Sequence, residues 1–192
     1  MKRIFTAIDI SNEARARTTN YIENLRGEFS QIRVGWERAE KLHLTLKFFG
    51  DVDEEQLTEL TVAIEETAKR LSDFKLRITE TGVFPSKRNA RILWLGVQGE
   101  TENLQKLNEI LETECEKKGF ARERRNFKAH LTIARLRGPR KSKELVERHL
   151  ENEFKAVEFQ VSRIAIYESH LQKTGSIYEA IKNVKLKIQN KD

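Results

Sequence analysis

Two short segments of the sequence repeat one four-residue pattern. His43-Leu44-Thr45-Leu46 recurs 87 positions later as His130-Leu131-Thr132-Ile133, in a chain that has four histidines. The pattern His-apolar-Thr-apolar alternates as a half-buried β-strand does. In a strand, side chains two positions apart share a face and stand about 6.6 Å apart. Each segment is therefore predicted to present one imidazole and one hydroxyl on one face, and two aliphatic groups on the other.

These residue types suit catalysis at a small anion such as a phosphate. Imidazole titrates near neutrality, so two histidines can supply one neutral base and one protonated acid at the same pH. One histidine would activate the nucleophile, and the other would protonate the leaving oxygen. The hydroxyls of Thr45 and Thr132 would donate hydrogen bonds to the non-bridging oxygens, where negative charge must be stabilised.

Two alternatives compete with catalysis. A single histidine in a strand is usually a half-buried structural residue, but the same pattern occurs twice here, which favours chemistry. A zinc site usually takes a third protein ligand, and no carboxylate falls on the His-Thr face of either segment. Neither pattern has the i, i+4 histidine spacing of zinc proteases. We therefore expect no metal and no other cofactor.

The composition predicts a globular protein. The chain has 192 residues, of which 38% are hydrophobic and 34% charged, enough for one domain or for two small lobes with a shared core. The single cysteine, Cys115, excludes an intramolecular disulfide. We find no signal-peptide pattern and no run of about 18 apolar residues, so we expect a cytoplasmic protein without membrane contact. The net charge of +6 favours anionic partners, with nucleic acid first.

Hydrophobic spacing and capping residues predict an alternation of strands and helices. We expect strands near residues 3–10, 33–37, 42–49, 74–83, 90–97, 127–136, 156–168 and 176–187. We expect a first helix over 12–28 with Ser11 as its N-cap, and a second helix that begins after a capping box of Asp53 and Gln56. We expect a third helix from an N-cap at Thr101 to near Gly119, and a fourth over 142–153.

Each half of the chain thus holds a motif strand, then a helix, then two strands, with no linker-like tract between the halves. This order predicts an α+β fold, one domain over residues 1–192. We expect two similar lobes with antiparallel sheets and outer helices. A pseudo-two-fold axis would place one His-Thr strand from each lobe beside a central cleft.

The chain resembles the 2H phosphoesterase superfamily, and in particular its RNA 2′,3′-cyclic phosphodiesterase branch, also known as 2′-5′ RNA ligases. The two HxTx motifs carry the resemblance. It covers nearly the full chain and includes Arg3–Asp9, Leu42–Gly50, Gly82–Pro85, Ile92–Gly96, Phe127–Leu136, Tyr167–Leu171 and Tyr178-Glu179.

The resemblance implies hydrolysis of RNA 2′,3′-cyclic phosphate ends to 2′-phosphomonoesters without a metal. It implies that His43 is the proton donor to the leaving oxygen and His130 the proton acceptor, with Thr45 and Thr132 binding the phosphate. The near-symmetric motifs do not themselves distinguish donor from acceptor. Two alternatives stay open: a 2′-5′ RNA ligase that acts on tRNA halves, and a non-catalytic RNA-binding module. We expect a monomer.

The resemblance also suggests that Arg135 approaches the substrate phosphate. Strict alternation would place Arg135, three residues after Thr132, on the face opposite His130, so this contact requires a bulge or a strand end. Other residues are expected to be structural or solvent-facing. Phe48 is predicted to pack in the core, His149 to lie inside on a helix, and His170 to face solvent.

Overall fold

One antiparallel sheet organises the chain. A computed structural model describes residues 1–138, 140–172 and 175–188. Within these ranges one sheet contains nine strands, and their bounds are β1 Lys2–Asp9, β2 Val34–Trp36, β3 His43–Val52, β4 Phe74–Phe84, β5 Ile92–Gly99, β6 His130–Leu136, β7 Val157–Val161, β8 Arg163–Gln172 and β9 Gly175–Lys185. The α-helices of the same ranges are α1 Asn12–Glu28, α2 Glu54–Ala68, α3 Thr101–Lys117 and α4 Lys143–Glu151.

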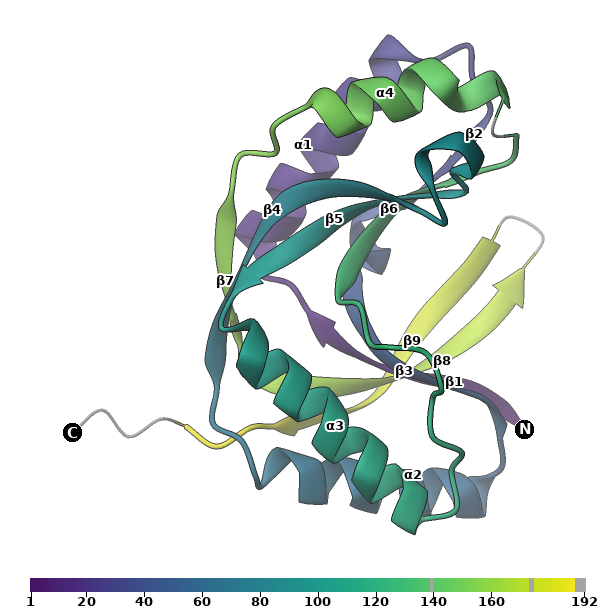
Figure 1. Cartoon of the computed structure of the whole chain (residues 1–192). Helices are drawn as coiled ribbons and strands as arrows, with labels where there is room; N and C mark the ends of the chain where they lie inside the picture. Colours follow the sequence, from purple (N-terminus) through teal and green to yellow (C-terminus); the bar gives the residue numbers. More distant parts are fainter. Residues whose placement is uncertain (139, 173–174, 189–192) are drawn as a thin grey trace.

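The motif strands β3 and β6 are neighbours in the middle of this sheet. The strand order is β7-β4-β5-β6-β3-β1-β8-β9, and the short β2 also pairs with β6. Helix α4 contacts β4 and α1 contacts β7, whereas α2 packs against α3 and also contacts β8 and β9. Figure 1 shows the two helix pairs at opposite ends of the molecule, with the strands between them. The predicted α+β class is confirmed.

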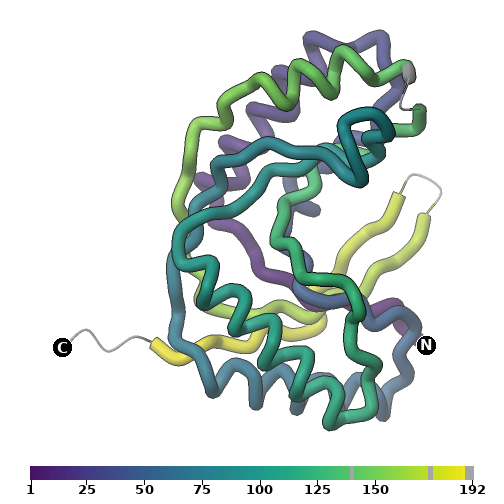
Figure 2. The backbone as a smooth tube through the Cα atoms, in the orientation of Figure 1, coloured from purple at the N-terminus to yellow at the C-terminus, as the bar shows by residue number. Residues whose placement is uncertain are grey.

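The strands are grouped differently from the halves of the sequence. The β4–β5 hairpin of the first half pairs with β6 through β5, and the β8–β9 hairpin of the second half pairs with β1. Figure 2 shows the β4–β5 hairpin crossing from the end near α2 and α3 to the end near α1 and α4. Strands from both halves of the sequence therefore stand on each side of the β3–β6 pair. The pseudo-two-fold relation between lobes stays a prediction.

The strand predicted over 156–168 is two strands at distant positions in the sheet. In β7, buried Val157, Phe159 and Val161 alternate with exposed residues, as expected for a strand covered on one face. In β8, Ile164 to Ile166 are buried without interruption, because this part of the strand is covered on both faces. Two burial patterns within one apolar stretch mark the change of strand at Ser162.

The predicted caps are confirmed for two helices. The Ser11 hydroxyl accepts from the Ala14 N–H at 3.1 Å, and Asp53 and Gln56 form a reciprocal capping box. Helix α3 begins differently, because Thr101 is its first helical residue and Glu100 occupies the N-cap position without capping it. The Glu100 carboxylate instead accepts from the Lys75 N–H at 2.7 Å, which ties the start of α3 to β4.

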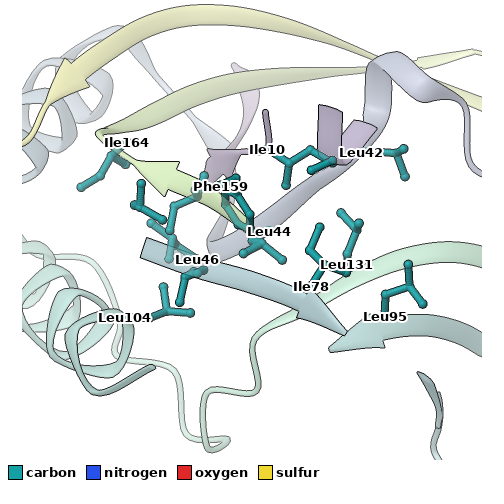
Figure 3. Close-up of a cluster of buried hydrophobic side chains, with 14 of the residues drawn as sticks. Ile10, Leu42, Leu44, Leu46, Ile78, Leu95, Leu104, Leu131, Phe159 and Ile164 are labelled. Carbon is teal, nitrogen blue, oxygen red and sulfur yellow. The ribbon is translucent and has the colours of Figure 1, made fainter. Parts of the chain in front are cut away.

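A row of buried aliphatic side chains crosses the middle of the sheet. Leu44 of β3 pairs with Leu131 of β6, Leu131 pairs with Leu95 of β5, and Leu44 pairs with Ile8 of β1. All four side chains are at most 1% exposed. Figure 3 shows Leu44, Leu131 and Leu95 within one cluster of buried hydrophobic residues. This row joins the strands of both ends of the sheet through one pair, Leu44 and Leu131.

We expect the Leu44–Leu131 pair to behave as one unit of stability. Leu44→Ala and Leu131→Ala should each lower the free energy of unfolding by about 2–5 kcal/mol, because each opens a cavity in the core. The double variant should lose about 0.5–3 kcal/mol less free energy of unfolding than the two single variants together, because each truncation already removes the contact between the two side chains. Urea unfolding monitored by circular dichroism measures the free energy of unfolding of the two single variants and of the double variant.

Leu60 provides the control for this cycle. It is fully buried on α2, a helix that packs mainly against α3. Leu60→Ala and Leu131→Ala should be additive within about 0.5 kcal/mol. If the losses of free energy of unfolding were also additive for Leu44→Ala and Leu131→Ala, the two side chains would not join the two ends of the sheet.

Candidate active site

The Leu44–Leu131 pair sets how the two motifs meet. β3 and β6 are antiparallel, and Leu44 lies opposite Leu131. At this register, the flanking residues come opposite each other: His43 with Thr132, and Thr45 with His130. Their side chains leave the sheet on the face away from the leucines. The structure thus gathers two histidines and two threonines on one face, with like residues on a diagonal. Diagonal neighbours in such a ladder lie about 7–8 Å apart.

A β-bulge in β6 places Arg135 on the same face as the histidines. Leu93 pairs with Ala134, but Trp94 pairs with Thr132, so Ile133 has no residue opposite it. Ile133 and Ala134 are both fully buried. The extra residue shifts the alternation by one, which returns Arg135 to the His130 face. The bulge that a phosphate contact by Arg135 requires is therefore present.

Strand β3 has the equivalent bulge, and it exposes Phe48. Thr6 pairs with Lys47 and Ala7 pairs with Thr45, so Leu46 has no residue opposite it. Leu46 and Lys47 are both buried, and Phe48 is 69% exposed. The prediction that Phe48 packs in the core is wrong, because the bulge reverses the alternation on which it rested. Phe48 and Arg135 occupy equivalent positions, five residues after each motif histidine.

The two motif histidines are held in the same tautomer. His43 Nδ1 lies 2.6 Å from the Lys41 carbonyl oxygen, and His130 Nδ1 lies 2.7 Å from the Lys128 carbonyl oxygen. A carbonyl only accepts, so each Nδ1 carries hydrogen and each neutral ring keeps its lone pair at Nε2. His43 Nε2 accepts from the Thr45 hydroxyl at 3.0 Å. The repeat therefore begins at a lysine two residues before each histidine, a signal that was present in the sequence.

Burial sets the charge state of these rings. It lowers the pKa of His43 from 6.5 to about 4, with a smaller opposing contribution from the Lys41 carbonyl. Burial likewise lowers the pKa of His130 below its usual value. The positive charge of Arg135 lowers both further, so Arg135 acts electrostatically on both rings. In the free protein, burial therefore favours the neutral form of both histidines.

The surroundings of the two histidines differ. Aromatic rings surround His43, with centroids at 5.0 Å for Phe5, 5.4 Å for Tyr178 and 6.2 Å for Tyr167. The His130 ring is nearly perpendicular to Phe84, with centroids 4.9 Å apart, has Trp94 at 6.5 Å, and borders a cavity of about 390 Å³. The near-symmetric motifs therefore lie in an asymmetric site, closed around His43 and open beside His130.

A carboxylate supports the closed side of the site. Asp9 lies opposite His43 in the β1–β3 ladder. Its oxygens accept from the Tyr167 hydroxyl at 2.6 Å and from the Arg163 guanidinium at 3.0 Å. Asp9 also acts on His43, whose pKa its negative charge raises in part. It fixes the aromatic ring beside His43. The sequence analysis placed Asp9, Tyr167 and Tyr178 in segments similar to the family but gave them no role, because β1, β8 and β9 come together only in the fold.

A buried ion pair connects the first motif strand to α3 and to the segment that leads to the second motif. Lys47 Nζ lies 2.6 Å from the Glu112 carboxylate of α3 and donates to the Ala121 carbonyl at 2.9 Å. The same carboxylate accepts from the Glu123 N–H at 3.1 Å. Lys47 follows the first motif, and Ala121 and Glu123 belong to the segment that leads to His130. The ion pair therefore anchors the approach to the second motif onto the strand of the first.

The two other histidines lie outside this group. His149 is fully buried: its Nε2 faces the Gly82 and Trp94 carbonyls at 3.0 and 3.2 Å, and its Nδ1 lies 2.9 Å from the Tyr21 hydroxyl. This confirms its structural role. His170 is exposed, as predicted, and lies 3.1 Å from Glu179.

Cys115 is buried, and burial raises the pKa of its thiol to about 12, so it packs as an apolar residue. Over residues 1–138, 140–172 and 175–188, no three His, Cys, Asp or Glu side chains lie close enough together to hold a metal ion. None of the helices there is long and apolar enough to cross a membrane.

Comparison with known proteins reveals close relatives over nearly the whole chain. The chain is 35% identical over 179 residues to the RNA 2′,3′-cyclic phosphodiesterase of Methanothermobacter thermautotrophicus, covering 92% of this chain and 94% of that protein. It is also 35% identical over 182 residues to the protein of the same name from Thermotoga maritima, covering 93% of this chain and 92% of that protein.

The fold and a family model agree with these relatives. The structure superposes on Escherichia coli LigT complexed with 3′-AMP with a TM-score of 0.76 at 22% identity, covering 96% of this chain and 98% of that one. This likeness concerns the fold alone. The family model described as the 2′-5′ RNA ligase superfamily matches residues 13–173. The chain therefore belongs to the 2′-5′ RNA ligase superfamily.

Proposed function

We propose that this protein hydrolyses the 2′,3′-cyclic phosphate ends of RNA to 2′-phosphomonoesters. The observation that carries the proposal is the meeting of His43, Thr45, His130 and Thr132 on one face through the Leu44–Leu131 pair. Two relatives at 35% identity are named RNA 2′,3′-cyclic phosphodiesterase, which supports the substrate class. One chain supplies all four side chains, so the proposal needs no second copy.

The asymmetry of the site supports a division of roles. The attacking and leaving oxygens of a displacement at phosphorus lie roughly in line, on opposite sides of the phosphorus. His130 borders the open cavity, so we assign it as the proton acceptor from the incoming nucleophile. His43 lies among aromatic rings, where the ribose that bears the leaving oxygen would pack, so we assign it as the proton donor.

The proposed step balances without any further reactant. The oxygen of a water attacks the phosphorus while the bond from phosphorus to O3′ breaks. His130 Nε2 takes the proton of the water, and His43 Nε2–H gives its proton to O3′. The product carries a 2′-phosphate and a 3′-hydroxyl. His43 must enter this step protonated, and the bound phosphate anion favours that state because it attracts the positive charge.

Thr45, Thr132 and Arg135 are assigned to binding the phosphate. In the neutral site the Thr45 hydroxyl donates to His43 Nε2. Once His43 is protonated, Nε2–H becomes a donor, so the Thr45 hydrogen is released to donate to a non-bridging oxygen. Arg135 is 58% exposed in its side chain and pairs with Glu37 at 3.2 Å. Its guanidinium can therefore turn to the phosphate without a loss of buried packing.

The first test is an assay with the histidine variants in the presence of EDTA. An RNA oligonucleotide that ends in a 2′,3′-cyclic phosphate should yield a 2′-phosphate, identified by its resistance to a 3′-specific phosphatase. His43→Ala and His130→Ala should each lower kcat by about 10²–10⁴-fold, because each removes a positioned acid or base.

His170→Ala is the matched control for this assay, because His170 is an exposed histidine outside the site. It should retain full activity. Absence of product from the unaltered protein would overturn the proposal, and a 3′-phosphate product would reverse the leaving-group assignment. Unchanged activity of both motif variants with equal binding of RNA would favour a non-catalytic RNA-binding module.

The lowered histidine pKa values predict an acidic optimum for the free enzyme. The proposed step needs one proton on the histidine pair, and both pKa values lie below 6.5. The profile of kcat/KM, which reports the free enzyme, should therefore be bell-shaped with its maximum below pH 6.5. The profile of kcat should lie nearer neutrality, because the bound anion raises both pKa values. Initial rates from pH 4 to 9 measure both; a kcat/KM maximum above pH 7 would contradict the proposed pair.

Arg135→Gln should affect both binding and the pH profile. We expect KM to rise about 10–100-fold, because a charged donor to the phosphate is lost. The alkaline limb of kcat/KM should move to higher pH, because the charge that lowers both histidine pKa values is removed. Arg148→Gln on α4, which breaks an exposed ion pair with Glu28 of α1, should change neither. An Arg135 variant with an unaltered KM and pH profile would exclude it from the site.

A further inference from the structure

Lys41 is a half-buried cation without a carboxylate partner. In the part of the chain that the structure describes, three lysines are buried or half-buried: Lys2, Lys41 and Lys47. Lys2 pairs with Glu54 at 3.1 Å and Lys47 with Glu112 at 2.6 Å, whereas no described carboxylate lies within 4 Å of Lys41 Nζ. Withdrawing a charge from water without a partner is costly, so this position favours a bound anion.

Lys41 lies on the same face as the first motif histidine, beside the aromatic rings that surround it. Leu42 is extended and buried, so Lys41 and His43 leave the backbone on the same side. Lys41 Nζ lies 5.8 Å from the centroid of the Tyr178 ring, and that ring is 5.4 Å from the His43 ring. Thr45 follows His43 along β3, so His43 separates the Lys41 ammonium from Thr45.

Two elements place the Lys41 ammonium. Lys41 ends the 3₁₀-helical turn Ala39–Lys41, and the Ala39 carbonyl of this turn accepts from the Arg15 guanidinium of α1. The β8–β9 hairpin reaches the same ammonium, because a Cβ atom at Gly175 would lie 3.6 Å from Lys41 Nζ. Figure 1 shows this hairpin projecting beyond the other strands. The ammonium is therefore in place before a ligand binds, which reduces the entropy cost of binding.

The place of Lys41 indicates which anion it binds. In the proposed function the cyclic phosphate binds to Thr45 and Thr132, and the ribose of the cyclic end packs on the His43 side. The 5′-oxygen of that ribose carries the next phosphate in an RNA strand, but only a hydrogen in a free nucleoside. We propose, on the basis of the proposed function, that Lys41 binds this internucleotide phosphate and so selects RNA ends over nucleoside 2′,3′-cyclic phosphates.

Such a contact positions the RNA end without reading its sequence, because every nucleotide carries the same phosphate. It holds the last internucleotide link on the His43 side, and with it the ribose whose O3′ receives the proton. The selection should therefore depend on the negative charge of the link and not on the base.

The test compares two dinucleotides that differ in one charge. Both end in a 2′,3′-cyclic phosphate and have the same bases; one has the ordinary internucleotide phosphate, and the other has an uncharged methylphosphonate in its place. The kcat/KM for hydrolysis should be about 10-fold higher with the phosphate link, because a hydrogen bond to a charged group is gained. This ratio should fall as the salt concentration rises.

Variants of Lys41 connect the ratio to its ammonium. Lys41→Met removes the charge and keeps the backbone carbonyl that binds His43. The ratio should fall from about 10 to about 1, and it cancels any loss in the chemical step that both dinucleotides share. Lys41→Arg keeps a cation and should retain most of the ratio. Lys155→Met, which changes an exposed lysine between α4 and β7, should retain all of it.

The outcomes separate this proposal from the proposed function. If the unaltered protein hydrolyses both dinucleotides with equal kcat/KM, or if Lys41→Met keeps the ratio, the internucleotide site is wrong and the hydrolytic function stands. If Lys41→Met lowers kcat/KM equally for both dinucleotides, the ammonium acts on the cyclic phosphate, which also contradicts the proposal. If neither dinucleotide is consumed, both proposals fall together.

Discussion

The pairing of Leu44 with Leu131 is the contact on which the rest of the site depends. It brings together strands that are 87 positions apart, and it does so by burying two aliphatic side chains completely. In a sheet, the side chains that flank a buried pair point to the other face. The hydrophobic effect thus positions four polar groups that have no strong attraction for one another. A shift by one residue in this register would bury the histidines and expose the leucines.

The bulges in β3 and β6 decide which later side chains of the two motif strands face the site. The last residue of each motif is the first of two consecutive buried residues, Leu46 with Lys47 and Ile133 with Ala134. A regular strand cannot bury two neighbours on one face, so each strand inserts an extra residue and reverses its alternation. The reversal presents Phe48 on the His43 side and Arg135 on the His130 side. Equivalent backbone geometry therefore supplies an aromatic surface at one position and a cation at the other.

Burial has opposite consequences for binding and for proton transfer in this site. The aromatic rings around His43 exclude water and lower its pKa to about 4, which keeps the free site neutral. In the proposed function, Arg135 and the two neutral histidines receive the phosphate anion, whose negative charge allows His43 to hold a proton. In this scheme substrate binding and protonation of the acid are one coupled event, so the acid is formed where a phosphate is present.

The sequence by itself determined which polar side chains share a face in each motif strand, and it predicted most of the helices and strands. The repeated alternation of His43 with Thr45 and of His130 with Thr132 placed each pair on one face, because side chains two apart in a strand share a face. Caps such as Ser11 and Asp53 are local, and they were predicted correctly. Only the tertiary structure decided how the hairpins are shared between the two ends of the sheet, where Phe48 and Arg135 point, and how far the histidine pKa values fall. These depend on cross-strand pairing and on burial by residues distant in sequence, such as Phe5 and Tyr178 around His43, and no local pattern in the sequence encodes them.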